Sequence, residues 1–236
     1  MSYLRISVAF SLIASVFGML VIVVLAMNPP ISDFNIAWRR PLVGSLFTAL
    51  CMIGIIAAFL PQTCSAALDH HGPKNQTVDA QKRPDKKVTR RAHHPDCGRF
   101  ASHTVRICNK TGCAACLGLA IGASIALAGT AMYFFFGVDL VQANLNVLFA
   151  GQIAVAFGLG QFKLRGFTRL VLNSIFVLGA FFTLVEIDTF TENVIADIYL
   201  LAIIVVWIFT RILLSQWDHD RICRACTERC SMAGEY

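Results

Sequence analysis

Long apolar runs separated by short polar segments dominate the chain. Six of these runs approach or exceed the roughly 20 residues that a helix needs to cross the hydrocarbon of a bilayer. They predict six transmembrane helices near Arg5–Met27, Leu42–Leu60, Cys113–Phe136, Ala143–Phe162, Phe167–Ile187 and Asn193–Ser215. The fourth run is the weakest, because it contains Asn144, Asn146, Gln152 and three glycines.

The first run also has a feature of secretory signal peptides, because Arg5 precedes an apolar core. That core is about 20 residues long, whereas the apolar region of a signal peptide spans about 7–15 residues. No small-x-small cleavage pattern precedes Asn28-Pro29-Pro30. We therefore expect the first run to be retained as a transmembrane helix.

The composition agrees with a membrane protein. Hydrophobic residues make up 56% of the 236 positions and charged residues 14%, with a mean hydropathy of +0.65. Soluble domains carry about 25% charged residues. The sequence therefore predicts an all-α polytopic membrane protein with six transmembrane helices and a small cytoplasmic Cys/His-rich element. The expected divisions are helices one and two (1–60), a basic linker with the Cys/His-rich element (61–112), helices three to six (113–215) and a Cys-rich tail (216–236).

The distribution of Lys and Arg predicts the orientation. We assigned each Lys or Arg within a predicted helix to the nearer end of that helix. On this count, 18 of the 20 Lys and Arg residues lie on the side of the N-terminus, 61–112, 163–166 and the tail. Lys and Arg in short loops mark the cytoplasmic side, so we expect a multi-pass cell-membrane protein with both termini in the cytoplasm. Arg39 and Arg40 oppose this orientation. The net charge of +6 follows from this topology, and no nucleic-acid partner is expected.

The first part of the long loop is polar and basic. Residues 72–91 contain Pro73 and Pro84 and few apolar side chains, so the segment cannot bury enough surface to offset the entropy of ordering it. The basic positions within 82–91 predict either contact with anionic lipid headgroups or a solvated tether. The lipid bilayer itself is the main expected partner.

Seven of the nine cysteines lie with histidines in two stretches beside apolar runs. In the loop, Cys113 and Cys116 have the C-x2-C spacing common in zinc sites, and they fall in the first turn of the third predicted helix, where the helix dipole favours thiolate. His94 and Cys97 form a second pair upstream. Cytoplasmic thiols are kept reduced, so a metal site is favoured over a structural disulfide. The predicted loop ligands are His94, Cys97, His103, Cys108, Cys113 and Cys116.

The tail carries a second set of predicted ligands: His219, Cys223, Cys226 and Cys230. Their spacing of 4, 3 and 4 places them on one face of a helix that continues the sixth run. Such a face is about 16 Å long at the helical rise per residue, so one ion cannot bind all four. Either the helix breaks into a Cys3His knuckle, or adjacent pairs complete sites begun by the loop. Zinc is preferred, with an iron–sulfur cluster as the alternative, and we expect loop and tail to meet over the start of the third helix.

Small residues recur every four positions along the third predicted helix, at Ala114, Gly118, Gly122, Ala126 and Thr130. This spacing allows close approach of two helix backbones. We therefore expect the third helix to lie centrally in the bundle.

Four polar residues inside the predicted spans are candidates for a transport path: Gln152, Asn173, Glu186 and Asp197. Ionisable groups within a membrane are functional hypotheses by default. The expected positions of Glu186 and Asp197 near external helix ends weaken that interpretation, because hydration is available there.

The segment from Cys97 through Phe100 to Cys113-x-x-Cys116-x-Gly118-x3-Gly122 resembles a family of small prokaryotic membrane proteins that has no assigned activity. The family pattern has His after the first Cys, where this chain has Gly98, and Arg where it has Ala115. The similarity covers about 30 residues and excludes the tail. It implies a paired Cys site at the start of a transmembrane helix.

Three classes of function fit these patterns. The first is a non-enzymatic membrane protein whose cytoplasmic metal site organises loop and tail for docking to a membrane-protein partner or for homo-oligomer assembly. The second is a metal-handling transporter, and the third a membrane thiol oxidoreductase that uses Cys113 and Cys116. We favour the first, with no catalytic or organic-cofactor residues, because the third normally requires an oxidising compartment.

Overall fold

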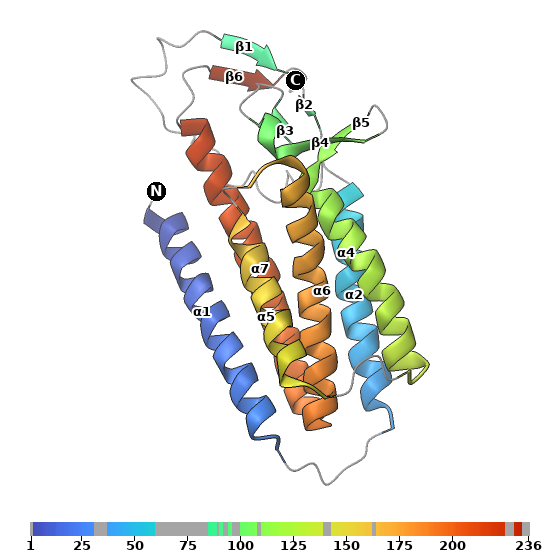
Figure 1. The fold of residues 1–236 in the computed structure, drawn as a ribbon. Coiled ribbons are helices and arrows are strands. Elements are labelled where there is room, and N and C mark those ends of the chain that lie inside the picture. Colours follow the sequence, from blue (N-terminus) through green and yellow to red (C-terminus); the bar gives the residue numbers. More distant parts are fainter. Residues whose placement is uncertain are drawn as a thin grey trace.

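The computed structural model describes residues 2–30, 37–59, 85–88, 90–91, 94–95, 100–107, 110–138, 143–161, 164–224 and 229–232. Its helices form a bundle in which the helix axes run side by side (Figure 1). The helices are α1 (Ser2–Met27), α2 (Arg39–Phe59), α4 (Ala114–Thr130), α5 (Leu145–Leu159), α6 (Gly166–Thr191) and α7 (Val194–Arg224). The predicted all-α polytopic fold is confirmed.

Five of the described helical segments are long and apolar enough to cross a membrane: Tyr3–Met27, Arg39–Phe59, Ala114–Phe135, Gly166–Thr191 and Val194–Ile222. The third of these includes the π-helical turn η4 (Ala131–Phe135), which continues α4. These five segments agree with five of the six predicted spans.

The remaining helix, α5, is shorter than the predicted span Ala143–Phe162. It has 15 residues, about 22 Å at the helical rise, against a hydrocarbon core of about 30 Å. Asn144 caps its start, because the Asn144 side chain accepts a hydrogen bond from the Asn146 amide at 2.9 Å. Its C-cap is Gly160.

The two ends of the bundle differ in what they carry. The N-terminus, the strands of the long loop and the strand near the C-terminus lie at one end, called here the loop end (Figure 1). The last turns of α1 and η4, the first turns of α2 and α5, and the turn between α6 and α7 lie at the other end, called here the turn end. The segments that hold most of the Lys and Arg thus share one end of the bundle, and its assignment to the cytoplasm stays a prediction.

Loop and tail meet at the loop end, and the finer prediction that they meet over the start of the third helix stays a prediction. β1 pairs in parallel with β6, with Lys86 opposite Cys230. Antiparallel pairs join β2 to β3 and β4 to β5, and a 3-10 turn, η3 (Ala101–His103), precedes β4. The strands are β1 (Asp85–Val88), β2 (Arg90–Arg91), β3 (His94–Pro95), β4 (Thr104–Ile107), β5 (Lys110–Cys113) and β6 (Arg229–Met232).

The sixth predicted span extends further than its hydropathy indicates. Its helix, α7, runs to Arg224 and ends before β6 begins at Arg229. His219 and Cys223 are therefore helical, whereas Cys230 lies in a strand. The helix therefore ends before Cys230, and which of the two predicted ligand arrangements the tail adopts stays a prediction.

The centre of the bundle is α6, which packs against α4, α5 and α7. In the most apolar 18-residue stretch of α6, 61% is buried within the bundle, which is more than in any of the other four long helices described. α1 packs mainly on α7 and leaves much of its apolar surface exposed, as lipid-facing helices do. The core contains Phe47, Leu148, Phe181, Leu184, Leu200 and Trp207.

The small residues of α4 form its contact with α6. All five predicted small positions are buried. A Cβ built on Gly118 would collide with the Leu170 carbonyl oxygen, and one on Gly122 would lie 2.7 Å from the Ser174 carbonyl oxygen. The Ser174 hydroxyl donates to the Gly118 carbonyl oxygen at 2.8 Å. The predicted close approach of backbones is therefore confirmed.

Substituting Gly118 with Ala should separate α4 from α6. The added methyl group meets backbone, which cannot rotate away, so we expect a loss of about 1–3 kcal/mol in the free energy of unfolding. Gly54→Ala in α2 is the matched control, because a Cβ there meets nothing within 4 Å. Unfolding of the purified protein in detergent measures both variants, and equal stability of the two would contradict the packing.

Candidate functional site

Four of the ten predicted ligands have described side chains: His103, Cys113, Cys116 and His219. The structure does not describe the side chains of the other six, and for three of these it does not describe the backbone either. The six are His94, Cys97, Cys108, Cys223, Cys226 and Cys230. Among the described side chains, no three His, Cys, Asp or Glu are grouped to hold a metal ion. Whether the ten form one site or two stays a prediction.

The Cys pair lies where the sequence placed it. Cys113 ends β5 and is the N-cap of α4, with extended backbone angles (φ −71°, ψ 121°). Its register opposite Thr104 fixes it to β4. Cys113 is buried and Cys116, within the first turn, is partly exposed. Both thiols thus lie where the amides of a helix N-terminus stabilise negative charge.

Arg169 of α6 lies beside this pair and was not identified from the sequence. Its guanidinium is close enough to interact electrostatically with the thiols of Cys113 and Cys116. It donates from Nη1 to His103 Nδ1 at 2.9 Å, and its Nη2 lies 4.0 Å from Asp218 Oδ2. Arg169 is buried. Ionisable residues within transmembrane segments are candidates for function. Arg169 lies within a predicted span, so the sequence alone could have identified it as a candidate.

His103 is fully engaged by these two partners. Because a guanidinium can only donate, His103 Nδ1 accepts from Arg169, so the ring proton of the neutral imidazole is on Nε2. That nitrogen lies 3.7 Å from Asp218 Oδ2. Both ring nitrogens therefore face protein groups, which favours a structural role for His103 over the predicted role of metal ligand.

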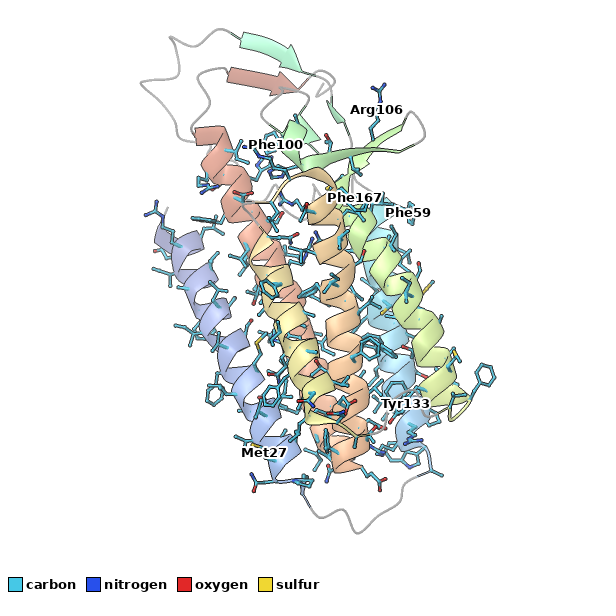
Figure 2. All side chains as sticks on the ribbon, in the orientation of Figure 1. Met27, Phe59, Phe100, Arg106, Tyr133 and Phe167 are labelled. Atoms are coloured by element: carbon cyan, nitrogen blue, oxygen red, sulfur yellow. The ribbon has the colours of Figure 1, made fainter. Side chains whose placement is uncertain are left out.

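The loop and α7 also meet through aromatic rings. Phe100 stacks on His219 with ring centroids 4.7 Å apart and packs edge-on against His103 at 5.4 Å. Figure 2 shows Phe100 at the loop end, beside the upper part of α7. On α7, Asp218 also pairs with Arg221 at 3.1 Å. Phe100, His103 and Asp218 therefore fasten the loop to α7 and α6.

A second polar group continues from Arg169 into the bundle. The Asn173 amide donates to the Arg169 carbonyl oxygen at 2.5 Å and to the Gln161 side chain. The Asn173 oxygen accepts from Arg211 Nε at 2.8 Å. Asn173 was predicted as a transport candidate, and here it joins α6, α7 and the segment after α5.

The turn end holds a separate cluster of charges. Arg39 Nη1 lies 2.8 Å from both Asp188 Oδ1 and Asp197 Oδ2, and Arg40 Nε lies 3.3 Å from Asp188 Oδ2. The Tyr133 hydroxyl donates to Asp188 Oδ2 at 2.7 Å; Figure 2 labels Tyr133 at this end. Two guanidinium groups thus face two carboxylates. This pairing explains how Arg39 and Arg40 are tolerated at the end opposite the other basic residues.

The remaining transport candidates are engaged in structural bonds. Glu186 Oε2 accepts from the Asn144 amide at 2.9 Å, and Gln152 donates to the Met19 carbonyl oxygen at 3.1 Å. Between the two charged clusters the core is mostly apolar, and the buried Thr183 hydroxyl donates to a backbone carbonyl. The described side chains therefore give little support to a relay of ionisable groups through the bundle.

Comparison with known proteins adds no assignment. No family model matches the chain, and no curated protein or solved structure matches it either. The resemblance over the segment from Cys97 to Gly122 stays a prediction. Function is therefore inferred from the chain's own residues.

Removing Arg39 should destabilise the turn end strongly. In Arg39→Met, Asp188 keeps Arg40 as a partner but Asp197 is left as an uncompensated buried charge, so we expect a loss of about 3–5 kcal/mol in the free energy of unfolding. Adding Asp197→Asn removes that charge, so the double variant should be more stable than Arg39→Met alone. Detergent unfolding of both variants measures this, and losses that simply add would refute the charge pairing.

Proposed function

We propose that this chain is a non-enzymatic integral membrane protein in which a cytoplasmic metal site, zinc by preference, organises loop and tail into a docking surface. The observation that carries the proposal is the placement of Cys113-x-x-Cys116 at the start of α4, at the end where loop and tail meet. The surface would bind a membrane-protein partner or a second copy of the chain.

The size of the loop-end element supports a metal. Its described strands have two to four residues each and form sheets of only two strands. Two-stranded sheets are marginally stable in water, and elements without a core of their own usually need a metal or a disulfide. Binding of a structural zinc ion contributes directly to folding free energy.

The proposed ligand set begins with the Cys pair at the start of α4. Cys113 and Cys116 supply the first pair, and the second pair comes from the thiols of Cys97, Cys108, Cys223, Cys226 and Cys230 or from His94, whose side chains lie outside those described. His219 stacks on Phe100, so we rank it below the cysteines. Four ligands of this kind suit the tetrahedral geometry of zinc.

The basic segment completes the proposed surface. Residues 82–91 carry six Lys or Arg and include β1, which pairs with the tail strand β6. With the loop end in the cytoplasm, these charges would meet anionic headgroups of the inner leaflet. The tail would then be held close to the membrane surface.

One observation favours a second candidate, a membrane thiol oxidoreductase. Cys113 and Cys116 lie at the N-terminus of α4 and close to the Arg169 guanidinium, and electropositive surroundings of this kind are typical of reactive as well as metal-binding cysteines. Metal content and thiol redox state distinguish the two candidates.

Elemental analysis of the purified full-length protein tests the proposal. We expect stoichiometric zinc in the wild type and its loss in Cys113→Ser and Cys116→Ser, because a serine hydroxyl is a poor zinc ligand. Cys51→Ser is the matched control: Cys51 is also buried, but it lies within α2, and zinc content should not change.

Absence of stoichiometric metal from the wild type would refute the metal site. If Cys113 and Cys116 were then recovered as a disulfide that a membrane quinone or a partner disulfide re-forms after reduction, the oxidoreductase would replace it.

A further inference from the structure

α5 ends before it reaches the loop end of the bundle, at a depth that belongs to the membrane. Gly158 lies beside Phe176 of α6, because a Cβ built on Gly158 would collide with the Phe176 side chain. From Phe176 to the end of α6 at Thr191 the helix rises about 22 Å, whereas the hydrocarbon of a bilayer is about 30 Å thick. The connection from α5 to α6 therefore begins about 8 Å below the loop-end surface of the hydrocarbon.

Backbone at this depth needs polar partners that hydrocarbon cannot supply. A helix leaves its last four carbonyl groups without partners inside the helix, and irregular backbone that faces lipid tails is not tolerated. Gly160, the C-cap of α5, is exposed and so is not covered by the rest of the bundle. A helix shorter than the hydrocarbon is accommodated by local thinning of the bilayer. Headgroups of the loop-end leaflet should therefore reach down to this connection.

The connection carries positive charge that nothing described balances. Residues 160–166 contain Lys163 and Arg165 but no Asp or Glu, and the first turn of α6 has no acidic residue. Within the described part of the chain, the Arg165 side chain is exposed and takes part in no hydrogen bond or ion pair. The connection is therefore complementary to a group with net negative charge.

The height of Arg165 along the bundle matches the headgroup layer. α6 has 26 residues, about 39 Å at the helical rise, and Arg165 directly precedes it. A bilayer with its headgroups is about 40–45 Å thick. A guanidinium at the start of α6 therefore lies at the level of the lipid phosphates when the other end of α6 lies at the opposite surface of the hydrocarbon.

We propose that the α5–α6 connection binds the headgroup of an anionic phospholipid, with Arg165 contacting its phosphate. The planar guanidinium matches a phosphate group and binds it through two parallel hydrogen bonds. Phe167 follows two residues later and is 70% exposed, so the acyl chains of the same lipid would cover its ring. The site does not require the metal site, and it is separate from the basic segment 82–91.

Native mass spectrometry of the purified full-length protein, titrated with single lipids, tests the site. The wild type should bind phosphatidylglycerol more tightly than phosphatidylcholine. Arg165→Gln should weaken binding of the first phosphatidylglycerol about fivefold, the effect of one cation near an anionic surface. Arg106→Gln is the matched control. Arg106 is also exposed and unpaired among the described residues, but Figure 2 shows it pointing away from the helices, so affinity should not change.

Equal affinity of the wild type for the two lipids, or wild-type affinity in Arg165→Gln, would overturn the proposal. Displacement of the lipid by inorganic phosphate would also overturn it, because the site would then select a free anion. A variant with the six Lys and Arg of 82–91 changed to Gln separates the two basic regions. The effect of Arg165→Gln should persist in that variant, and its disappearance would assign the lipid to residues 82–91. Zinc content should be unchanged in Arg165→Gln, so the metal site is tested independently.

Discussion

Backbone contact between α4 and α6 is the constraint on which the loop end depends. Gly118 and Gly122 let the two helices approach so closely that a methyl group at either position would meet α6 backbone. Because no hydrophobic force drives helix association within lipid, such packing and the hydrogen bonds across it hold the helices together. The contact also fixes which residues meet above it: the first turn of α4, with Cys113 and Cys116, lies beside Arg169 at the start of α6. Loop, tail and thiols are thus positioned by a packing interaction inside the membrane-spanning region.

Buried charges then join segments that packing alone would leave loosely connected. At the turn end, Arg39 of α2 lies between Asp188 of α6 and Asp197 of α7. At the loop end, Arg169 lies between η3 and α7. Both clusters join residues that are far apart in the sequence. Neither can form before α6 and α7 have packed against each other. A buried ion pair adds little net stability over an apolar pair, but a missing partner is costly. These clusters therefore specify one arrangement of helices more than they strengthen it.

Apolar patterning was sufficient to predict the long helices, and small-residue spacing predicted the close contact of α4 with α6. The expectation that α4 lies at the centre was wrong, because α6 packs against α4, α5 and α7 and is the more buried helix. The lengths of two helices, α5 and α7, differ from the prediction because hydropathy does not indicate where a helix begins or ends. α5 begins after its N-cap, Asn144, and ends before its C-cap, Gly160. α7 extends to Arg224 because polar residues beyond Ser215 remain helical while Asp218 and His219 contact the loop. The ion pairs could not be predicted, since the sequence does not show which of several acidic residues Arg39 would meet. In the count of Lys and Arg, Arg39 was only an exception to the predicted orientation. Of the candidate site, the sequence indicated the Cys pair and the loop–tail contact but not Arg169.

The contrast between the two charged clusters is the reason to seek function at the loop end. At the turn end two guanidinium groups face two carboxylates at 2.8–3.3 Å, and among the described residues Asp197 Oδ1 has no hydrogen-bond partner there. At the loop end the buried Arg169 has its nearest described carboxylate at 4.0 Å and a neutral imidazole at 2.9 Å. Sequences usually satisfy their buried charges, and the sites that do not are commonly functional. The thiols of Cys113 and Cys116 are close enough to this guanidinium to interact with it electrostatically. The buried Arg169 and the Cys113-x-x-Cys116 pair therefore lie at the same end of the bundle, and this is where a metal site is proposed.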